Sequence, residues 1–169
     1  MTKNNSAKTI LLKLLSFVPS LALLFLIFGF SSQDGESSGS LSFRISLFLV
    51  ELFAPILPTA LSEDMLYERA EFIHLFVRKA AHMMEYFLLA LSLQLPLASC
   101  FSHRTGWRTR LGTGFLLTVC FAALDEYHQT FVPGRSGNIT DIGIDSIGAV
   151  AASLLLYIFF SIRQKRQTA

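Results

Sequence analysis

The stretch LDEYHQTFVPGRSGNITDIGIDSIG, residues 124–148, decides how the rest of the chain is read. It lies between two strongly apolar runs, residues 111–123 and 147–162. Among its polar and charged side chains are Asp125, Glu126, His128, Gln129, Arg135, Asp141 and Asp145. Ionisable groups beside lipid-facing helices are costly, so they usually face one another or a water-filled cavity. The stretch therefore predicts a functional site inside a membrane protein.

The composition is that of an integral membrane protein. Of the 169 residues, 52% are hydrophobic and 16 are Phe, and the mean hydropathy is +0.51, which is too apolar for one soluble domain of this length. The net charge is only +2, and no basic patch interleaved with aromatic residues predicts a nucleic-acid partner. Cys100 and Cys120 have neither CxxC nor zinc-finger spacing, so no disulfide or zinc site is predicted from them.

Four apolar segments have the length of about 20 residues that a membrane-spanning helix needs. They are residues 10–30, 72–97, 111–131 and 141–162. The first is read as a retained helix, kinked at Pro19, rather than as a cleaved signal peptide, because its apolar run is long and lacks a small-residue cleavage site.

The segment between the first two spans has a different character. Residues 31–42 are rich in Ser and Gly and are expected to form a loop. Residues 43–61 are apolar but contain Pro55 and Pro58, so we expect an interfacial or re-entrant helix, with a fifth span as the alternative. The predicted fold class is thus all-α, a single integral membrane bundle of four transmembrane helices plus this short helix.

Three local signals mark helix ends and turns. Ser62, followed by two acidic residues, is expected to cap the second span at its N-terminus. Pro133-Gly134 predicts a type II turn. Either Asn138 or Thr140 is expected to cap the fourth span.

The charges separate by side in a four-span topology. Nine Lys and Arg residues lie at the N-terminus, between the second and third spans, and in the tail, whereas the other five and all twelve acids lie on the opposite side. The positive-inside rule counts Lys and Arg, so both termini are predicted to be cytoplasmic. The charged ends of the second, third and fourth spans then meet at the outer leaflet.

Helical spacing places these charges on shared faces. Three polar residues share a face on each of the second and third spans, and two share a face on the fourth: Arg78, His82 and Glu85; Asp125, His128 and Gln129; Asp141 and Asp145. Small residues follow at 148, 149, 152 and 153, which lets helices approach closely. We therefore expect a bundle that is tight below and opens outward into a polar cavity.

Several chemistries fit these side chains. Arg78, Lys79 and Arg135 suit a phosphate or carboxylate clamp, or else pair with the acids or with lipid phosphates. Glu126 and His128 are the acid–base candidates, with a paired structural role as the alternative. The i, i+3 pairs His82/Glu85 and Asp125/His128 suit either metal ligation or salt bridges, and Tyr86 suits donation to a ligand. Metal and cofactor are left open.

The motifs RKAAHMMEYFLLAL, residues 78–91, and LDEYHQTFVPGRSGNITDIGIDSIGA, residues 124–149, resemble the VanZ-like family of bacterial membrane proteins. The FSSQ at residues 30–33 also fits. The resemblance implies a multi-helix protein of the bacterial cytoplasmic membrane. Its namesake is associated with low-level resistance to the lipoglycopeptide teicoplanin, which need not extend to this chain. The resemblance supplies no catalytic assignment.

The leading hypothesis is an outward-facing polar cavity that binds an anionic or polar cell-envelope ligand. The partners it predicts are membrane lipids and either a lipid-linked envelope precursor or a lipoglycopeptide antibiotic. The predicted ligand-binding residues are Arg78, Lys79, His82, Glu85, Tyr86, Asp125, Gln129, Arg135, Asp141 and Asp145. Two alternatives stay open. One is a membrane-embedded hydrolase or transferase that acts on a lipid-linked phosphate or ester. The other is a structural or partner-docking protein whose polar cluster only locks the bundle.

Overall fold

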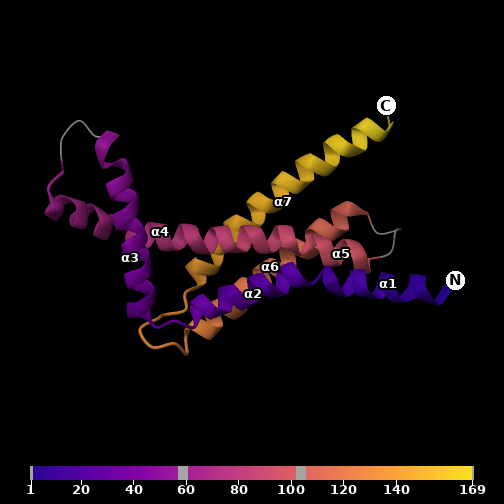
Figure 1. Cartoon of the computed structure of the whole chain (residues 1–169), viewed down its shortest axis with the longest axis horizontal. Coiled ribbons are helices and arrows are strands. Elements are labelled where there is room, and N and C mark those ends of the chain that lie inside the picture. The colour runs from indigo at the N-terminus through magenta and orange to yellow at the C-terminus, as the bar shows by residue number, and fades with distance from the viewer. Residues whose placement is uncertain (1, 57–60, 102–105, 169) are drawn as a thin grey trace.

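The computed structural model describes residues 2–56, 61–101 and 106–168, and these residues form helices joined by short turns, with no strand among them (Figure 1). The elements are α1 Thr2–Leu15, α2 Val18–Ser31, α3 Gly35–Phe53, the 3-10 turn η1 Ala54–Ile56, α4 Glu63–Ser92, α5 Gln94–Cys100, α6 Trp107–Gln129 and α7 Ile139–Thr168. The predicted all-α class is confirmed.

Four helical segments of the described chain are long and apolar enough to cross a membrane: Ala7–Ser31, Gly35–Ile56, Glu63–Cys100 and Ile139–Gln167. Three of them contain the predicted first, second and fourth spans. The predicted third span corresponds to α6, which is not in this set; its first turn carries Arg108 and Arg110, and it ends with a polar DEYHQ stretch. Its place is taken by α3, but Figure 1 shows α3 lying across the end of the bundle, as an interfacial helix does.

The bundle is held together by α2, α4, α6 and α7. α4 packs on α2, α6 and α7, and α6 packs on α2 and α7, while α3 lies against α4 and α1 contacts α5. One buried apolar cluster joins α2, α4 and α6 through Ile27, Tyr86, Leu89, Leu93 and Ala122. A second joins α4 to α7 through alanines. The core is thus a set of helix–helix seams.

The seam between α4 and α7 is built on small residues. A Cβ added at Gly148 would lie 2.0 Å from the carbonyl oxygen of Met83 and 2.9 Å from the amide nitrogen of Phe87. Ala149 and Ala152 beside it are fully buried. Close backbone approach is a main source of helix association where lipid removes the hydrophobic driving force. The small-residue prediction is therefore confirmed.

The predicted loop at residues 31–42 is wrong. α2 continues to Ser31, and α3 begins at Gly35 after Asp34, whose side chain accepts a hydrogen bond from the Ser37 amide at 2.7 Å. The acidic N-cap favours the start of this helix, and serine hydroxyls find acceptors in carbonyls of the same helix, so the Ser/Gly-rich stretch is compatible with a helix there. The predicted helix at 43–61 is the second half of α3 followed by η1, and residues 57–60 lie outside the described chain.

The local signals were read correctly. Ser62 accepts a bond from the Met65 amide at 3.4 Å and caps α4. Gly134 has φ 71°, and the amide of residue 135 donates to the carbonyl of residue 132, as a type II turn requires. The side chain of Asn138 caps the start of α7 by accepting from the amide of residue 140. The expected kink falls at residues 16–17, directly before Pro19 in the first turn of α2.

Figure 1 shows both termini at the end of the bundle opposite α3 and the α6–α7 loop. At the terminal end, the Trp107 ring packs against Tyr157 and Phe160, with ring centroids 5.4 and 5.6 Å away, and the Arg108 guanidinium lies 5.3 Å from the indole. An aromatic girdle next to basic residues is typical of a membrane interface. The polar site lies at the other end.

Candidate functional site

A polar cavity of about 180 Å³ lies between α4, α6, α7 and the α6–α7 loop. The predicted site residues that line it are Arg78, Lys79, His82, Glu126, Gln129, Arg135, Asp141 and Asp145. Three helices that are far apart in sequence therefore bring polar side chains to one pocket, as their helical spacing predicts.

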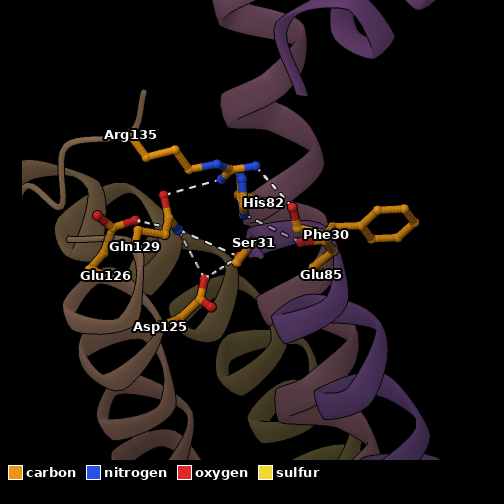
Figure 2. Close-up of polar contacts among 8 residues, drawn as sticks. All are labelled: Phe30, Ser31, His82, Glu85, Asp125, Glu126, Gln129 and Arg135. Carbon is orange, nitrogen blue, oxygen red and sulfur yellow. Dashed lines mark hydrogen bonds and ion pairs between the residues drawn. The ribbon is translucent and has the colours of Figure 1, made fainter. Parts of the chain in front are cut away.

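The floor is a buried hydrogen-bond network between α2 and α6 (Figure 2). The Ser31 hydroxyl donates to Asp125 Oδ2 at 2.7 Å, and Gln129 Nε2 donates to the same oxygen at 3.1 Å. All three side chains are buried. Buried polar groups are costly unless they are bonded, so this network determines which face of α6 meets α2.

Arg135 joins the α6–α7 loop to the end of α2. Its Nε donates to the carbonyl of Gln33 at 2.8 Å, its second terminal nitrogen donates to the carbonyl of Phe30 at 2.9 Å, and the first donates to Gln129 Oε1 at 3.2 Å. Figure 2 shows the guanidinium reaching across to Phe30 and Gln129. The Phe30 carbonyl belongs to the last turn of α2 and Gln33 follows directly after that helix, where a cation is favourable. Arg135 is thus first a cap for α2.

Arg135 also faces another cation. Burial, and next the nearby positive charge of Arg78, lower the pKa of Arg135 below its ordinary value. Arg78 itself makes no hydrogen bond or ion pair with any residue in the described part of the chain. The cavity therefore has one guanidinium that is bound to carbonyls and a second that is half-buried without a partner.

Glu126 connects α6 to the beginning of α7. Its Oε2 accepts from the backbone amide of Asn138 at 2.9 Å, and its Oε1 accepts from Gln129 at 3.2 Å. A Cβ at Gly137 would lie 2.2 Å from the Glu126 carbonyl oxygen, so the loop passes directly over this turn. The carboxylate is held by two N–H donors while it still lines the cavity.

The α4–α7 wall contains the remaining charges. Lys79 and Asp141 form an ion pair across the two helices. His82 Nδ1 lies 3.4 Å from Glu85 Oε2 on α4, and the buried Asp145 is within electrostatic range of His82. Lys79 is therefore paired with a carboxylate of the protein, in contrast to Arg78.

Not every predicted residue reaches this cavity. Tyr86 is fully buried in the apolar cluster, and Asp125 lies beneath the cavity in the network with Ser31. His128 packs against the ring of Phe28 at a centroid distance of 5.9 Å. Positions 126 and 128 are about 200° apart around a helix, so the structure does not bring the candidate acid–base pair into one pocket.

The metal alternative finds no geometric support in the described chain, where no three His, Cys, Asp or Glu side chains converge. Six buried polar atoms do lack a hydrogen-bond partner there: His82 Nδ1, Glu85 Oε2, Tyr86 Oη, Asp125 Oδ1, His128 Nδ1 and Asp145 Oδ2. Such atoms normally bond water or a ligand.

Sequence reasoning missed the contribution of α2. Ser31 supplies a donor to the buried network, and the carbonyls of Phe30 and Gln33 hold Arg135. These residues belong to the FSSQ segment, which was noticed only as part of a resemblance. No spacing rule links residue 31 to residue 125, because their contact depends on the packing of two helices.

A second, more apolar cavity of about 210 Å³ lies beside the polar one. Its walls come from α3, α4 and the end of α2, and it shares Arg78, His82 and Arg135 with the polar cavity. Glu85 also lines it. The cations therefore stand at the junction of a polar and an apolar space.

Comparison with protein families gives a match to the VanZ/LLP1 model over residues 14–160. This chain belongs to the VanZ/LLP1 family. The match runs from the first helices to α7 and includes every residue of both cavities, so the resemblance drawn from the motifs is confirmed. Comparison with the curated proteins and with the solved structures gave no match. Membership in the VanZ/LLP1 family, together with four apolar helices, makes this a membrane protein.

Proposed function

We propose that this VanZ-like membrane protein binds an anionic or polar cell-envelope ligand in the cavity between α4, α6 and α7. The observation that carries the proposal is the Arg78 guanidinium, which is half-buried, lines the cavity together with Arg135 and has no bonded partner among the described residues. Two like charges in a place of reduced dielectric repel each other, and an anion placed between them removes the repulsion. Guanidinium groups match phosphate and carboxylate oxygens in geometry as well as charge.

The other ionic groups in the cavity do not supply that anion. Lys79 and Asp141 neutralise each other, and the Glu126 carboxylate is held by the Asn138 amide and Gln129. Arg135 uses three of its five N–H groups on carbonyl oxygens and leaves the others for a ligand. The site thus has the donors an anion needs and spare positive charge at Arg78.

The side of the membrane follows from charge distribution. Both termini lie at the end opposite the cavity, and the basic residues of the tail lie with them (Figure 1). With the termini cytoplasmic, as the positive-inside rule predicts, the cavity opens at the outer face of a bacterial cytoplasmic membrane. A lipid headgroup or a lipoglycopeptide would meet it there, and a link to teicoplanin-type resistance would act through such binding.

Part of the cluster supports the structural alternative. Ser31, Asp125 and Gln129 are buried and bonded to one another, and Arg135 caps α2. These residues hold α2 and the α6–α7 loop in place. We therefore expect two classes of variant. Substitutions of Ser31, Asp125, Gln129 or Arg135 should lower stability, whereas substitution of Arg78 should weaken ligand binding and leave stability unchanged. The enzyme alternative gains nothing from the geometry, because His128 faces Phe28 rather than the cavity.

The test compares Arg78→Gln with Arg69→Gln in the full purified chain. Arg69 lies on the same helix, is exposed and lines neither cavity. Binding of an anionic and a zwitterionic lipid of equal chain length is measured by native mass spectrometry. Losing charged hydrogen bonds of about 1.5–3 kcal/mol predicts a roughly tenfold to hundredfold weaker affinity of Arg78→Gln for the anionic lipid.

Arg69→Gln is expected to bind like the wild type. Equal binding by all three proteins, with preserved helicity by circular dichroism, would contradict the proposal.

A further inference from the structure

The apolar cavity next to the polar site is lined by complementary faces of two helices. α3 contributes Leu41 and Ile45, which are one helical turn apart, and α4 contributes Val77 and Ala81, which are also one turn apart. Phe30, at the end of α2, closes one side. Each helix thus presents a single apolar face to one groove, and Leu41 and Ile45 are both exposed enough to meet lipid.

The groove and the polar cavity adjoin each other at a charged rim. Arg78, His82 and Arg135 line both spaces. When a ligand places a negative group against Arg78, the rest of that ligand can therefore extend into the apolar groove between α3 and α4. The arrangement complements a ligand with one compact anionic end and one hydrocarbon end.

The size of the polar cavity restricts the anionic end. At about 180 Å³ it is smaller than the roughly 300–1,000 Å³ of pockets that enclose drug-sized ligands. A phosphate group fits such a space completely, whereas a glycopeptide antibiotic would leave most of its peptide outside it. A phosphate also matches the paired guanidinium groups.

We infer that the ligand is a phosphate carried on a long hydrocarbon chain, with the phosphate in the polar cavity against Arg78 and the chain in the groove between α3 and α4. The inference rests on the proposed function and names the ligand class for it. A diacyl phosphatidic acid and a polyprenyl phosphate share this chemistry. The crosswise position of α3 gives the groove its outer wall (Figure 1).

The close packing of α3 on α4 makes this wall firm. Ser42 and Ser46 of α3 and Ala70 of α4 are buried, and the Phe43 ring stacks on Tyr67 at 6.0 Å. The Ser42 and Ser46 hydroxyls bond carbonyls of their own helix, so they present no free donor at the seam. The groove surface is mostly apolar, with Ser38 and Ser42 as the polar residues on α3, so a hydrocarbon chain there meets mainly apolar atoms while the polar end stays at the charged rim.

The experiment fills the groove without touching the charges. In Ala81→Phe the new ring occupies the groove, and in the control Ala80→Phe the same ring is placed at an exposed position of α4 that lines neither cavity. The purified full chain is tested by native mass spectrometry with phosphatidic acid, polyprenyl phosphate, and phosphatidylcholine as the neutral competitor. Binding of inorganic phosphate, a probe without a chain, is measured by isothermal calorimetry.

We expect Ala81→Phe to bind both chain-bearing phosphates about tenfold more weakly, which is the loss for roughly two methylene groups forced out of apolar surroundings. Inorganic phosphate should bind Ala81→Phe and wild type equally, and Ala80→Phe should match wild type throughout. The tighter of the two lipid phosphates identifies the source of the ligand.

The failures of the two proposals differ in this experiment. If Arg78→Gln weakens binding of every phosphate probe but Ala81→Phe binds the lipids as wild type does, the groove assignment is overturned and the anion site stands. If Arg78→Gln changes the binding of no probe, the anion site is overturned and the groove assignment falls with it.

Discussion

The contact between α4 and α7 at Gly148 allows a sharp test of the packing that forms the cavity. In Gly148→Ala the new methyl would lie 2.0 Å from the Met83 carbonyl oxygen, where ordinary contact begins at 3.4 Å. The neighbouring atoms are backbone on a helix, so no side-chain rotation relieves the overlap, and the helices must separate by roughly 1 Å or more. Gly143 on the same helix has nothing within 4 Å of its added Cβ and is the matched control.

The expected changes in stability have opposite signs at Gly143 and Gly148. Replacing a helical Gly by Ala stabilises by about 0.5–1 kcal/mol through backbone entropy, which is the whole effect expected for Gly143→Ala. At Gly148 the overpacking cost of about 1–3 kcal/mol opposes that gain. We therefore expect Gly148→Ala to be less stable than Gly143→Ala by about 1–3 kcal/mol.

The assay is reversible unfolding in mixed micelles of a mild detergent and SDS, followed by far-ultraviolet circular dichroism. Separating α4 from α7 should also weaken the Lys79–Asp141 pair across the cavity and lower affinity for an anionic lipid. Equal unfolding free energies for the two variants, or a Gly148→Ala protein more stable than wild type, would refute the close-packing argument.

Three further changes test the floor and the caps. Arg135→Lys should lower the free energy of unfolding by about 1.5–3 kcal/mol, because an ammonium group cannot reproduce the planar three-bond contact with the end of α2; thermal unfolding measures it. Ser31→Ala removes a buried donor to Asp125 and should lower the free energy of unfolding by about 1–3 kcal/mol. Ser32 is the control, because its exposed hydroxyl bonds only its own helix, and Ser32→Ala should change the free energy of unfolding by less than about 0.5 kcal/mol in the same assay. Asp34, the cap of α3, has a pKa that is lowered by its bonds to the amide and hydroxyl of residue 37. Its contribution to the stability of the fold is therefore present above the unfolded pKa and is lost as the pH falls through the lower folded pKa. The melting temperatures of wild type and Asp34→Ala should converge below about pH 4, and a difference that stays constant with pH would contradict this.

Much of the site was predictable because it depends on helical periodicity. Arg78 and His82 are four residues apart, and so are Asp141 and Asp145, which places each pair on one face. Since the apolar runs determine how the chain crosses the bilayer, the polar ends of three helices had to meet at one depth. The cavity confirms this meeting, although the roles of its residues stay predictions.

The sequence-based prediction failed where one local pattern is compatible with two structures. The Ser/Gly-rich stretch at 31–42 has the composition of a loop, yet the Asp34 cap and serine bonds to helix carbonyls allow α3 to form. The anion-clamp role of Arg135 stays a prediction, but its three bonds to the end of α2 and to Gln129 could not be read from the sequence, because they depend on how the α6–α7 loop docks.

The sequence by itself determined that this is an all-helical membrane protein, that its twelve acids fall at one end and most of its basic residues at the other, and that α7 presents small residues such as Gly148 to a neighbour. Only the tertiary structure decided that Ser31 meets Asp125, that Arg135 caps α2, and that α3 crosses the bundle to wall an apolar groove. The physical reason is the distance along the chain over which each effect acts. Periodicity fixes the face on which a side chain lies, whereas the partner of that face depends on how helices remote in sequence pack together.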